Sequence, residues 1–252
     1  MAPLREIVPL AFNLDRQTEG VRYALIMAER EPTDPVLLER LAGYLTEEGD
    51  LDRALKMCET AATLCQNNAP KPGEEPRPKA AQVPLWMELG RLYFLTKKYE
   101  QSAKYFGQVY EALEKPEEFG LDARAQKALL NKAELAYQLF GESFLEGGKP
   151  EQALAAFDKA NQIKPDEALS LYNRARVDAK LKQPAQALAK LETYLDKHFS
   201  SQGTAPYALL GEVLTDLGQK DQLLARLDKA RAADAENLPL SYYLAQQYLQ
   251  GG

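Results

Sequence analysis

One eight-residue stretch, Trp86–Tyr93, constrains the fold of this chain more than any other part of the sequence. Its tryptophan is followed by a leucine, a glycine and a tyrosine at distances of three, four and seven residues. Residues at these distances share one face of an α-helix. Because Gly90 has no side chain, a neighbouring helix can approach that face closely. The stretch therefore predicts a helix that packs tightly against a second helix.

A complementary pattern follows downstream, where Ala153 and Phe157 precede Pro165. The segment that leads into it repeats the first stripe with Tyr137, Phe140, Gly141 and Phe144. The two patterns, W-x-x-L-G-x-x-Y and A-x-x-x-F with a later proline, resemble the tetratricopeptide repeat (TPR) family, whose repeats are helix pairs of about 34 residues. The resemblance covers most of the chain. It implies an all-α fold, a right-handed α-α superhelix (solenoid) of TPR helix pairs, with the first helix of each pair on the concave face.

The repeat pattern predicts a single solenoid over residues 1–252. When Trp86 is placed at the fourth position of a repeat, full repeats begin at Pro35, Val83, Glu134, Ala168 and Thr204. The predicted segments are a degenerate capping repeat at 1–34, a repeat at 35–68, a proline-rich inserted loop at 69–82, a repeat at 83–116, an insertion at 117–133 that extends the next helix, repeats at 134–167, 168–203 and 204–237, and a terminal helix, or half repeat, at 238–252.

Two insertions separate the early repeats. Four prolines and a glycine in residues 69–80 forbid a continuous helix there and indicate a surface loop, or alternatively a proline-rich docking motif. From Leu121 to about Glu146 the only helix breaker is Gly141, so we expect one unusually long helix with Asp122 as its N-cap. Such an extension either braces the neighbouring repeat or carries a dimer contact.

The formal charge of -6 argues against non-specific binding to nucleic acid or to anionic membranes, which needs a basic surface. No apolar run reaches the length of about 18 residues that a membrane-spanning helix needs, and the first residues lack the pattern of a secretory signal. We therefore expect a cytoplasmic protein without a membrane-inserted segment.

Residues suited to catalysis or metal binding are few. The only histidine, His198, lies near the end of a predicted helix, and no nucleophile or orienting group accompanies it in the sequence. Cys58 and Cys65 stand seven residues apart on one predicted helix, too far for a disulfide, and are interpreted as small packing residues. The sequence thus predicts no catalytic residue, no metal site and no cofactor.

The resemblance also implies which side chains line the concave groove. The candidate partner-binding residues are Met87, Arg91, Phe94, Leu95, Gln138, Glu142, Tyr172, Arg176, Lys180, Glu212 and Tyr242. Among them, Met87, Phe94 and Leu95 would form an apolar pocket for a partner's side chain. Arg176 and Lys180 stand between two acidic helix faces, so they either neutralise neighbouring carboxylates or belong to a polar groove that recognises a peptide. Some members of the family clamp a peptide carboxylate with paired lysines and asparagines. Only Asn173 occupies such a position, so this clamp is not expected.

The last predicted helix is rich in tyrosine and leucine, unlike the polar outer face of a terminal cap. Either it pairs with another chain, with Tyr243 and Tyr248 as the candidate self-association residues, or the sequence is a fragment of a longer array. The predicted function is a protein-interaction scaffold or adaptor that binds a peptide or helix of a partner protein, without catalysis. The alternatives are a self-assembling structural protein, with homo-oligomers formed through the last helix, and a regulatory segment of a larger protein.

Overall fold

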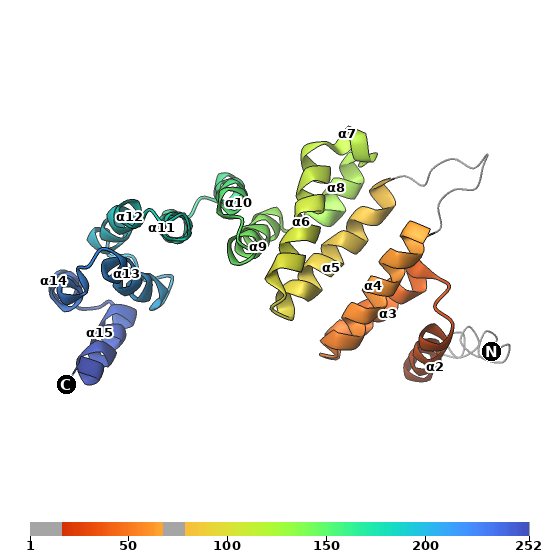
Figure 1. The fold of residues 1–252 in the computed structure, drawn as a ribbon, viewed down its shortest axis with the longest axis horizontal. Helices are drawn as coiled ribbons and strands as arrows, with labels where there is room; N and C mark the ends of the chain where they lie inside the picture. The colour runs from red at the N-terminus through yellow and green to blue at the C-terminus, as the bar shows by residue number, and fades with distance from the viewer. Residues whose placement is uncertain (1–16, 68–78, 252) are drawn as a thin grey trace. The chain divides into compact units, whose positions relative to one another are not determined.

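The computed structural model describes residues 17–67 and 79–251, and all regular secondary structure in these ranges is helical (Figure 1). The helices are α2 (Gln17–Arg30), α3 (Pro35–Glu47), α4 (Leu51–Asn67), α5 (Val83–Leu95), α6 (Tyr99–Glu114), α7 (Pro116–Phe119), α8 (Ala123–Leu129), α9 (Ala133–Glu146), α10 (Pro150–Ile163), α11 (Glu167–Lys180), α12 (Pro184–Asp196), α13 (Ala205–Asp216), α14 (Leu223–Ala233) and α15 (Leu238–Gly251), with short 3-10 turns η1 (Lys79–Gln82) and η2 (Lys220–Gln222). The predicted all-α class is confirmed.

The chain separates into two compact units, Met1–Asn131 and Lys132–Gly252. In the first unit the pairs α3/α4 and α5/α6 pack side by side, with α2 against α3. The second unit stacks the pairs α9/α10, α11/α12 and α13/α14, and α15 packs against α13 and α14. Within each unit this is the predicted solenoid arrangement of helix pairs.

The helix pairs form because small residues on one helix admit large ones from its partner. In the first unit, a β-carbon at Gly90 of α5 would lie only 2.6 Å from the ring of Phe106 on α6. Both residues are buried. The close approach predicted at Gly90 is thus present. Trp86 is half-buried, and its ring meets that of Phe119 on α7 edge-on, with 6.2 Å between the ring centroids.

The first helices begin where the repeat pattern placed them. Helices α3 and α5 start at Pro35 and Val83, the predicted residues, and α9, α11 and α13 start within one residue of the predicted positions. Asp34 caps α3 by accepting hydrogen bonds from two amide groups of its first turn, which explains why this helix starts so sharply. Helix α2 lies within the segment 1–34, the predicted degenerate capping repeat.

The prediction of one long helix from Leu121 to Glu146 is wrong. Asp122 does cap a helix, since its carboxylate accepts the amide hydrogen of Ala125 at 2.7 Å, but that helix, α8, ends at Leu129. Residues 130–132 form a turn, and α9 starts afresh. No residue of α8 is buried. Because packing supplies most of a helix's stability, apolar spacing alone could not hold this segment in line with α9.

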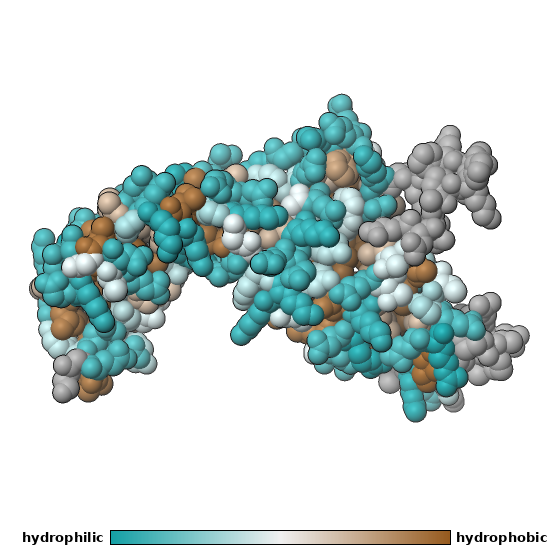
Figure 2. All heavy atoms as spheres, viewed as in Figure 1, coloured by the Kyte–Doolittle hydropathy of each residue, from teal (hydrophilic) through white to brown (hydrophobic). Residues whose placement is uncertain are grey.

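Two predicted segments lie partly outside the described residues: the first 16 residues of the capping repeat, and residues 69–78 of the proline-rich loop. The remainder of that loop is η1. In the described parts of the chain, no helix has both the length and the apolar character needed to cross a bilayer. The face shown in Figure 2 is mostly hydrophilic, with apolar residues in separate patches.

Candidate functional site

The first helices of the second unit enclose two adjoining cavities. One, of about 510 Å³, is lined by residues of α9, α11 and α13 and by Lys182 in the turn after α11. The other, of about 530 Å³, is lined by α13, α15, η2 and the start of α14. Ala208, Glu212 and Asp216 of α13 line both. We call this continuous surface the trough. Four of the candidate groove residues line it: Tyr172, Arg176, Lys180 and Glu212.

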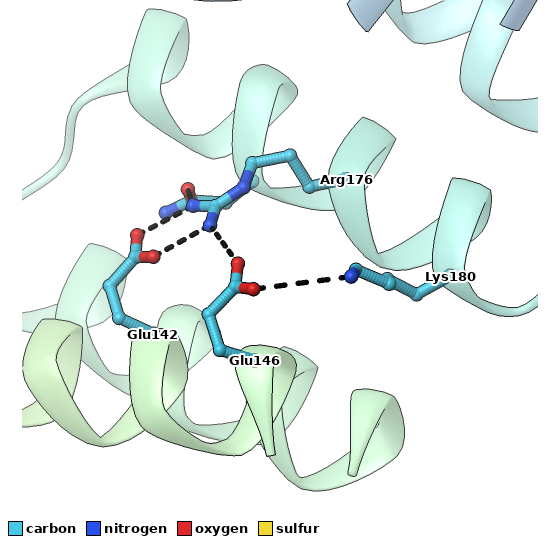
Figure 3. Close-up of polar contacts among 5 residues, drawn as sticks. Glu142, Glu146, Arg176 and Lys180 are labelled. Carbon is cyan, nitrogen blue, oxygen red and sulfur yellow. Dashed lines mark hydrogen bonds and ion pairs between the residues drawn. The ribbon is translucent and has the colours of Figure 1, made fainter. Parts of the chain in front are cut away.

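A cluster of charged residues borders the trough (Figure 3), since Glu146, Arg176 and Lys180 belong to its lining. The Arg176 guanidinium on α11 donates to both carboxylate oxygens of Glu142 on α9, each at 2.6 Å. It also donates to Glu146, at 3.3 Å, and Lys180 lies 4.0 Å from the other oxygen of Glu146. The predicted mutual neutralisation is therefore present, and Glu142 and Arg176, which occupy the same position in successive repeats, tie those repeats together.

The arginine at the centre of this cluster is largely buried, with 17% of its side chain exposed. Burial lowers the pKa of Arg176, but the hydrogen bonds and charge of Glu142 outweigh burial and raise the pKa above its ordinary value. The guanidinium also lies 5.5 Å from the ring centroid of Tyr172 and 3.5 Å from Asn173. These contacts fix its position, so Arg176 is held as a structural cation.

The charges open to a ligand lie farther along the trough. Glu212 and Asp216 are exposed on α13, four residues apart and hence on the same face of the helix. Burial raises the pKa of the Tyr172 phenol, and Glu142 and Glu212 raise it further against the opposing effect of Arg176. The trough thus combines a fixed aromatic wall with a pair of exposed carboxylates, alongside the exposed cations Lys180 and Lys182.

In the first unit, Met87 and Arg91 line a separate cavity of about 390 Å³ between α3 and α5. Its other residues include Glu39, Glu47 and Glu88, and Arg91 donates two hydrogen bonds to Glu88, at 2.7 and 3.0 Å. Burial, followed by the charge of Glu88, raises the pKa of Glu39. This cavity is acidic, in contrast to the apolar pocket predicted around Met87.

The other predicted groove residues lie elsewhere. Phe94 packs edge-on against Tyr99, with 5.5 Å between the ring centroids, and Leu95 is exposed; neither lines the cavity that Met87 lines. Gln138 lines a small apolar cleft at the other end of α9. Tyr242 is exposed on α15, outside the lining of the trough.

The two tyrosines predicted to mediate self-association differ in environment. Tyr243 packs inside the second unit, with its ring centroid 6.1 Å from that of Tyr207, and it also lines the trough. Tyr248 is exposed, and its hydroxyl donates a hydrogen bond to Asp228. Tyr243 therefore belongs to the fold of its own unit, and Tyr248 remains at the surface.

The residues considered for catalysis or metal binding are dispersed. His198 is exposed, in a left-handed conformation (φ 55°) just after α12. Cys58 is buried and unbonded, and burial raises its pKa to about 12, so its thiol stays protonated. Within residues 17–67 and 79–251, no three His, Cys, Asp or Glu residues form a group that could hold a metal ion.

The acidic neighbours of Arg91 and the small cleft near Gln138 were not predicted from the sequence. The cleft could have been found from Leu135 and Leu169, which stand 34 residues apart at the second position of successive repeats. Spacing along the sequence does not show that a cleft opens between these two leucines.

Comparison with known proteins identifies two of the repeats. A family model described as tetratricopeptide repeat matches residues 83–118 and 135–167. No curated protein matches the chain by sequence.

Among solved structures, YrrB, a TPR protein with an unusual peptide-binding site, is 13% identical, with a TM-score of 0.47, over 87% of this chain and 96% of that chain. TTC0263, a thermophilic TPR protein of Thermus thermophilus, is 19% identical, with a TM-score of 0.42, over 86% and 100% of the two chains. The TPR2AB domain of yeast Sti1, in a complex with pHSP90, is 17% identical, with a TM-score of 0.35, over 98% and 96%. Similarities this distant say nothing about the partners of this chain.

Proposed function

We propose that this tetratricopeptide repeat protein is an interaction scaffold, without catalysis, that binds a linear segment of a partner protein in the trough of its second unit. The observation that carries the proposal is the trough itself. Two cavities of about 510 and 530 Å³ adjoin along α13, and first helices from successive pairs line them. Their joint extent suits a chain segment better than a compact metabolite.

The lining of the trough supports a peptide ligand. The charge cluster of Arg176, Glu142 and Glu146 fixes one wall before any ligand arrives, which lowers the ordering cost of binding. The exposed carboxylates of Glu212 and Asp216 would pair with a lysine or arginine of the ligand. Such pairs contribute to specificity and to the rate of encounter more than to affinity.

A random peptide library of twelve residues displayed on phage, selected on the full chain, tests this proposal. Selected peptides should lose most of their affinity for the double variant Glu212→Lys/Asp216→Lys. The matched control is Glu151→Lys/Asp196→Lys, which makes the same charge change at exposed positions of α10 and α12, outside the trough. Binding in the trough would be contradicted if both double variants lost peptide affinity equally, or if neither double variant lost affinity.

Self-assembly through α15 is the second candidate function, and the exposure of its apolar side chains favours it. Leu238, Tyr242 and Leu249 are 75%, 62% and 84% exposed. Sedimentation equilibrium across concentrations should show an oligomer that the double variant Tyr242→Glu/Leu249→Glu converts to a monomer. A monomer at all concentrations for the unaltered chain excludes this candidate. Tyr243 is unsuited to the test because it packs within its own unit.

A further inference from the structure

A small cleft opens at the N-terminal ends of α9 and α11, beside the last turn of α10. Its volume is about 120 Å³, and apolar atoms form most of its lining. Leu135 on α9 and Leu169 on α11 flank it, and Phe157 and Ala160 of α10 are also among its lining residues. Leu135 is 56% exposed, so a large apolar surface beside the cleft has no cover in the second unit.

The size of the cleft limits what can occupy it. Pockets for whole small-molecule ligands measure about 300–1,000 Å³, several times the volume observed here. An apolar cavity of about 150 Å³ holds a benzene-sized group. A cleft of about 120 Å³ therefore accepts one aliphatic side chain and is too small for an indole ring or for a packed helix.

Polar groups around the cleft suit the main chain that would carry such a side chain. Gln138, Ser170 and Asn173 all belong to its lining. Asn173 is buried, with 2% of its surface exposed, and its side-chain oxygen accepts a hydrogen bond from Arg176 at 3.5 Å. Because Arg176 also lines the trough, Asn173 and Arg176 link the cleft to the trough along one face of α11.

We propose that this cleft is an anchor site for a single aliphatic side chain, that of leucine, isoleucine or methionine, in a linear peptide whose other residues lie over the trough. The inference rests on the proposed function, since it assumes a peptide in the trough. It adds the class of peptide that is recognised. The ligand carries one leucine, isoleucine or methionine at a fixed distance from a basic residue, and that basic residue pairs with Glu212 and Asp216.

Peptides selected from the twelve-residue phage library provide the first test. Their sequences should align with an aliphatic residue at one position, and replacing that residue with alanine should weaken binding about tenfold or more, as expected for burial of a leucine-sized side chain. Replacing it with tryptophan should weaken binding at least as much, because the cleft cannot hold the larger ring.

The matched protein variants are Leu135→Asp and Ile163→Asp. Both place a carboxylate at an exposed aliphatic position of the second unit, but Ile163, 49% exposed on α10, does not line the cleft. Leu135→Asp should weaken the selected peptides about tenfold or more, and Ile163→Asp less than about twofold. Circular dichroism of both variants should match that of the unaltered chain.

The outcomes separate the two proposals. Peptides that depend on Glu212 and Asp216 but show no aliphatic position, or that bind Leu135→Asp unchanged, overturn the anchor site and leave the proposed function standing. If no selected peptide depends on the trough, the proposed function fails, and the cleft is tested with N-acetyl-leucinamide against the 15N-labelled full chain. Saturable shifts at the amides of Leu135, Leu169 and Ser170, absent with N-acetyl-aspartamide, support the cleft as an aliphatic site. If the two probes cause identical amide shifts, or if N-acetyl-leucinamide causes none, the cleft is not an aliphatic site.

Discussion

The ring of Phe157 on α10 occupies the space where a side chain at Gly141 on α9 would begin: a β-carbon built at Gly141 would lie 2.4 Å from two ring carbons. Both residues are buried, and Phe157 is 4% exposed. The contact involves Cγ of the ring as well as its edge, so a side chain at Gly141 could be admitted only if the whole ring moved. Glycine at this position is therefore a requirement of the packing.

Gly141→Ala should lower the free energy of unfolding by about 1–3 kcal/mol, since overpacking outweighs the better helix propensity of alanine. Gly90→Ala should lower the free energy of unfolding by a similar amount, because a β-carbon at Gly90 would lie 2.6 Å from the ring of Phe106. Gly211→Ala is the control, because its β-carbon would meet the flexible end of Leu223 at 3.3 Å. Urea unfolding followed by circular dichroism measures all three. Equal effects at Gly141 and Gly211 would refute this account of the packing.

The pair of Arg176 and Glu142 should be coupled more strongly than an exposed pair. A double-mutant cycle with Arg176→Ala and Glu142→Ala should give a coupling of about 1–3 kcal/mol, because the pair is bidentate and largely buried. The comparison is Arg53 with Glu29, whose side chains are 46% and 49% exposed. That cycle should give less than about 1 kcal/mol. Similar coupling energies in the two cycles would show that burial does not strengthen the interaction between Arg176 and Glu142.

The turns after α5 and α11 carry lysines, Lys97 and Lys182, where the turns after α3, α9 and α13 carry glycine. Lys97 has φ 60°, while Gly148 occupies the equivalent turn after α9 with φ 75°. A left-handed conformation costs a residue with a β-carbon about 1–2 kcal/mol, and the greater unfolded-state freedom of glycine offsets part of this. Lys97→Gly should therefore raise the melting temperature slightly, and Gly148→Ala should lower it. A fall with Lys97→Gly would mean that the lysine side chain stabilises the turn.

The acidic cavity of the first unit should give a pH-dependent stability. The pKa of Glu39 is raised above its ordinary value of 4.5, so the folded protein binds this proton more tightly than the unfolded chain. Its contribution to stability is complete below about pH 4.5 and is lost as the pH rises through the raised pKa. Glu39→Gln should thus raise the melting temperature at pH 7 and have little effect at pH 4. Glu47→Gln, at an exposed position of the same helix, is the control. A gain of equal size at both pH values would contradict burial as the cause.

Much of the fold followed from short-range patterns. The stripe around Gly90 predicted a close helix partner, and helix starts near Val83 and Glu134 followed from counting repeats. The pairing of Arg176 with Glu142 could also be predicted, because equivalent positions of adjacent repeats face each other.

What the sequence did not reveal depends on packing over longer distances. Helical spacing continues through Asn131, but no residue of the preceding helix, α8, is fully buried, and that helix ends at Leu129. Helical spacing in the sequence also does not show that the environments of Tyr243 and Leu135 differ. Both are apolar positions on first helices, yet one contacts the ring of Tyr207 and the other is exposed.

Binding of a peptide in the trough is the central claim. The most direct measurement is titration of the 15N-labelled full chain with a selected library peptide, followed by amide chemical shifts. The shifts should concentrate on the trough residues of α11 and α13, around Tyr172, Glu212 and Asp216, and should leave the outer helices α12 and α14 unchanged beyond Leu223. Shifts concentrated on α12 and α14, with α11 and α13 undisturbed, would contradict it.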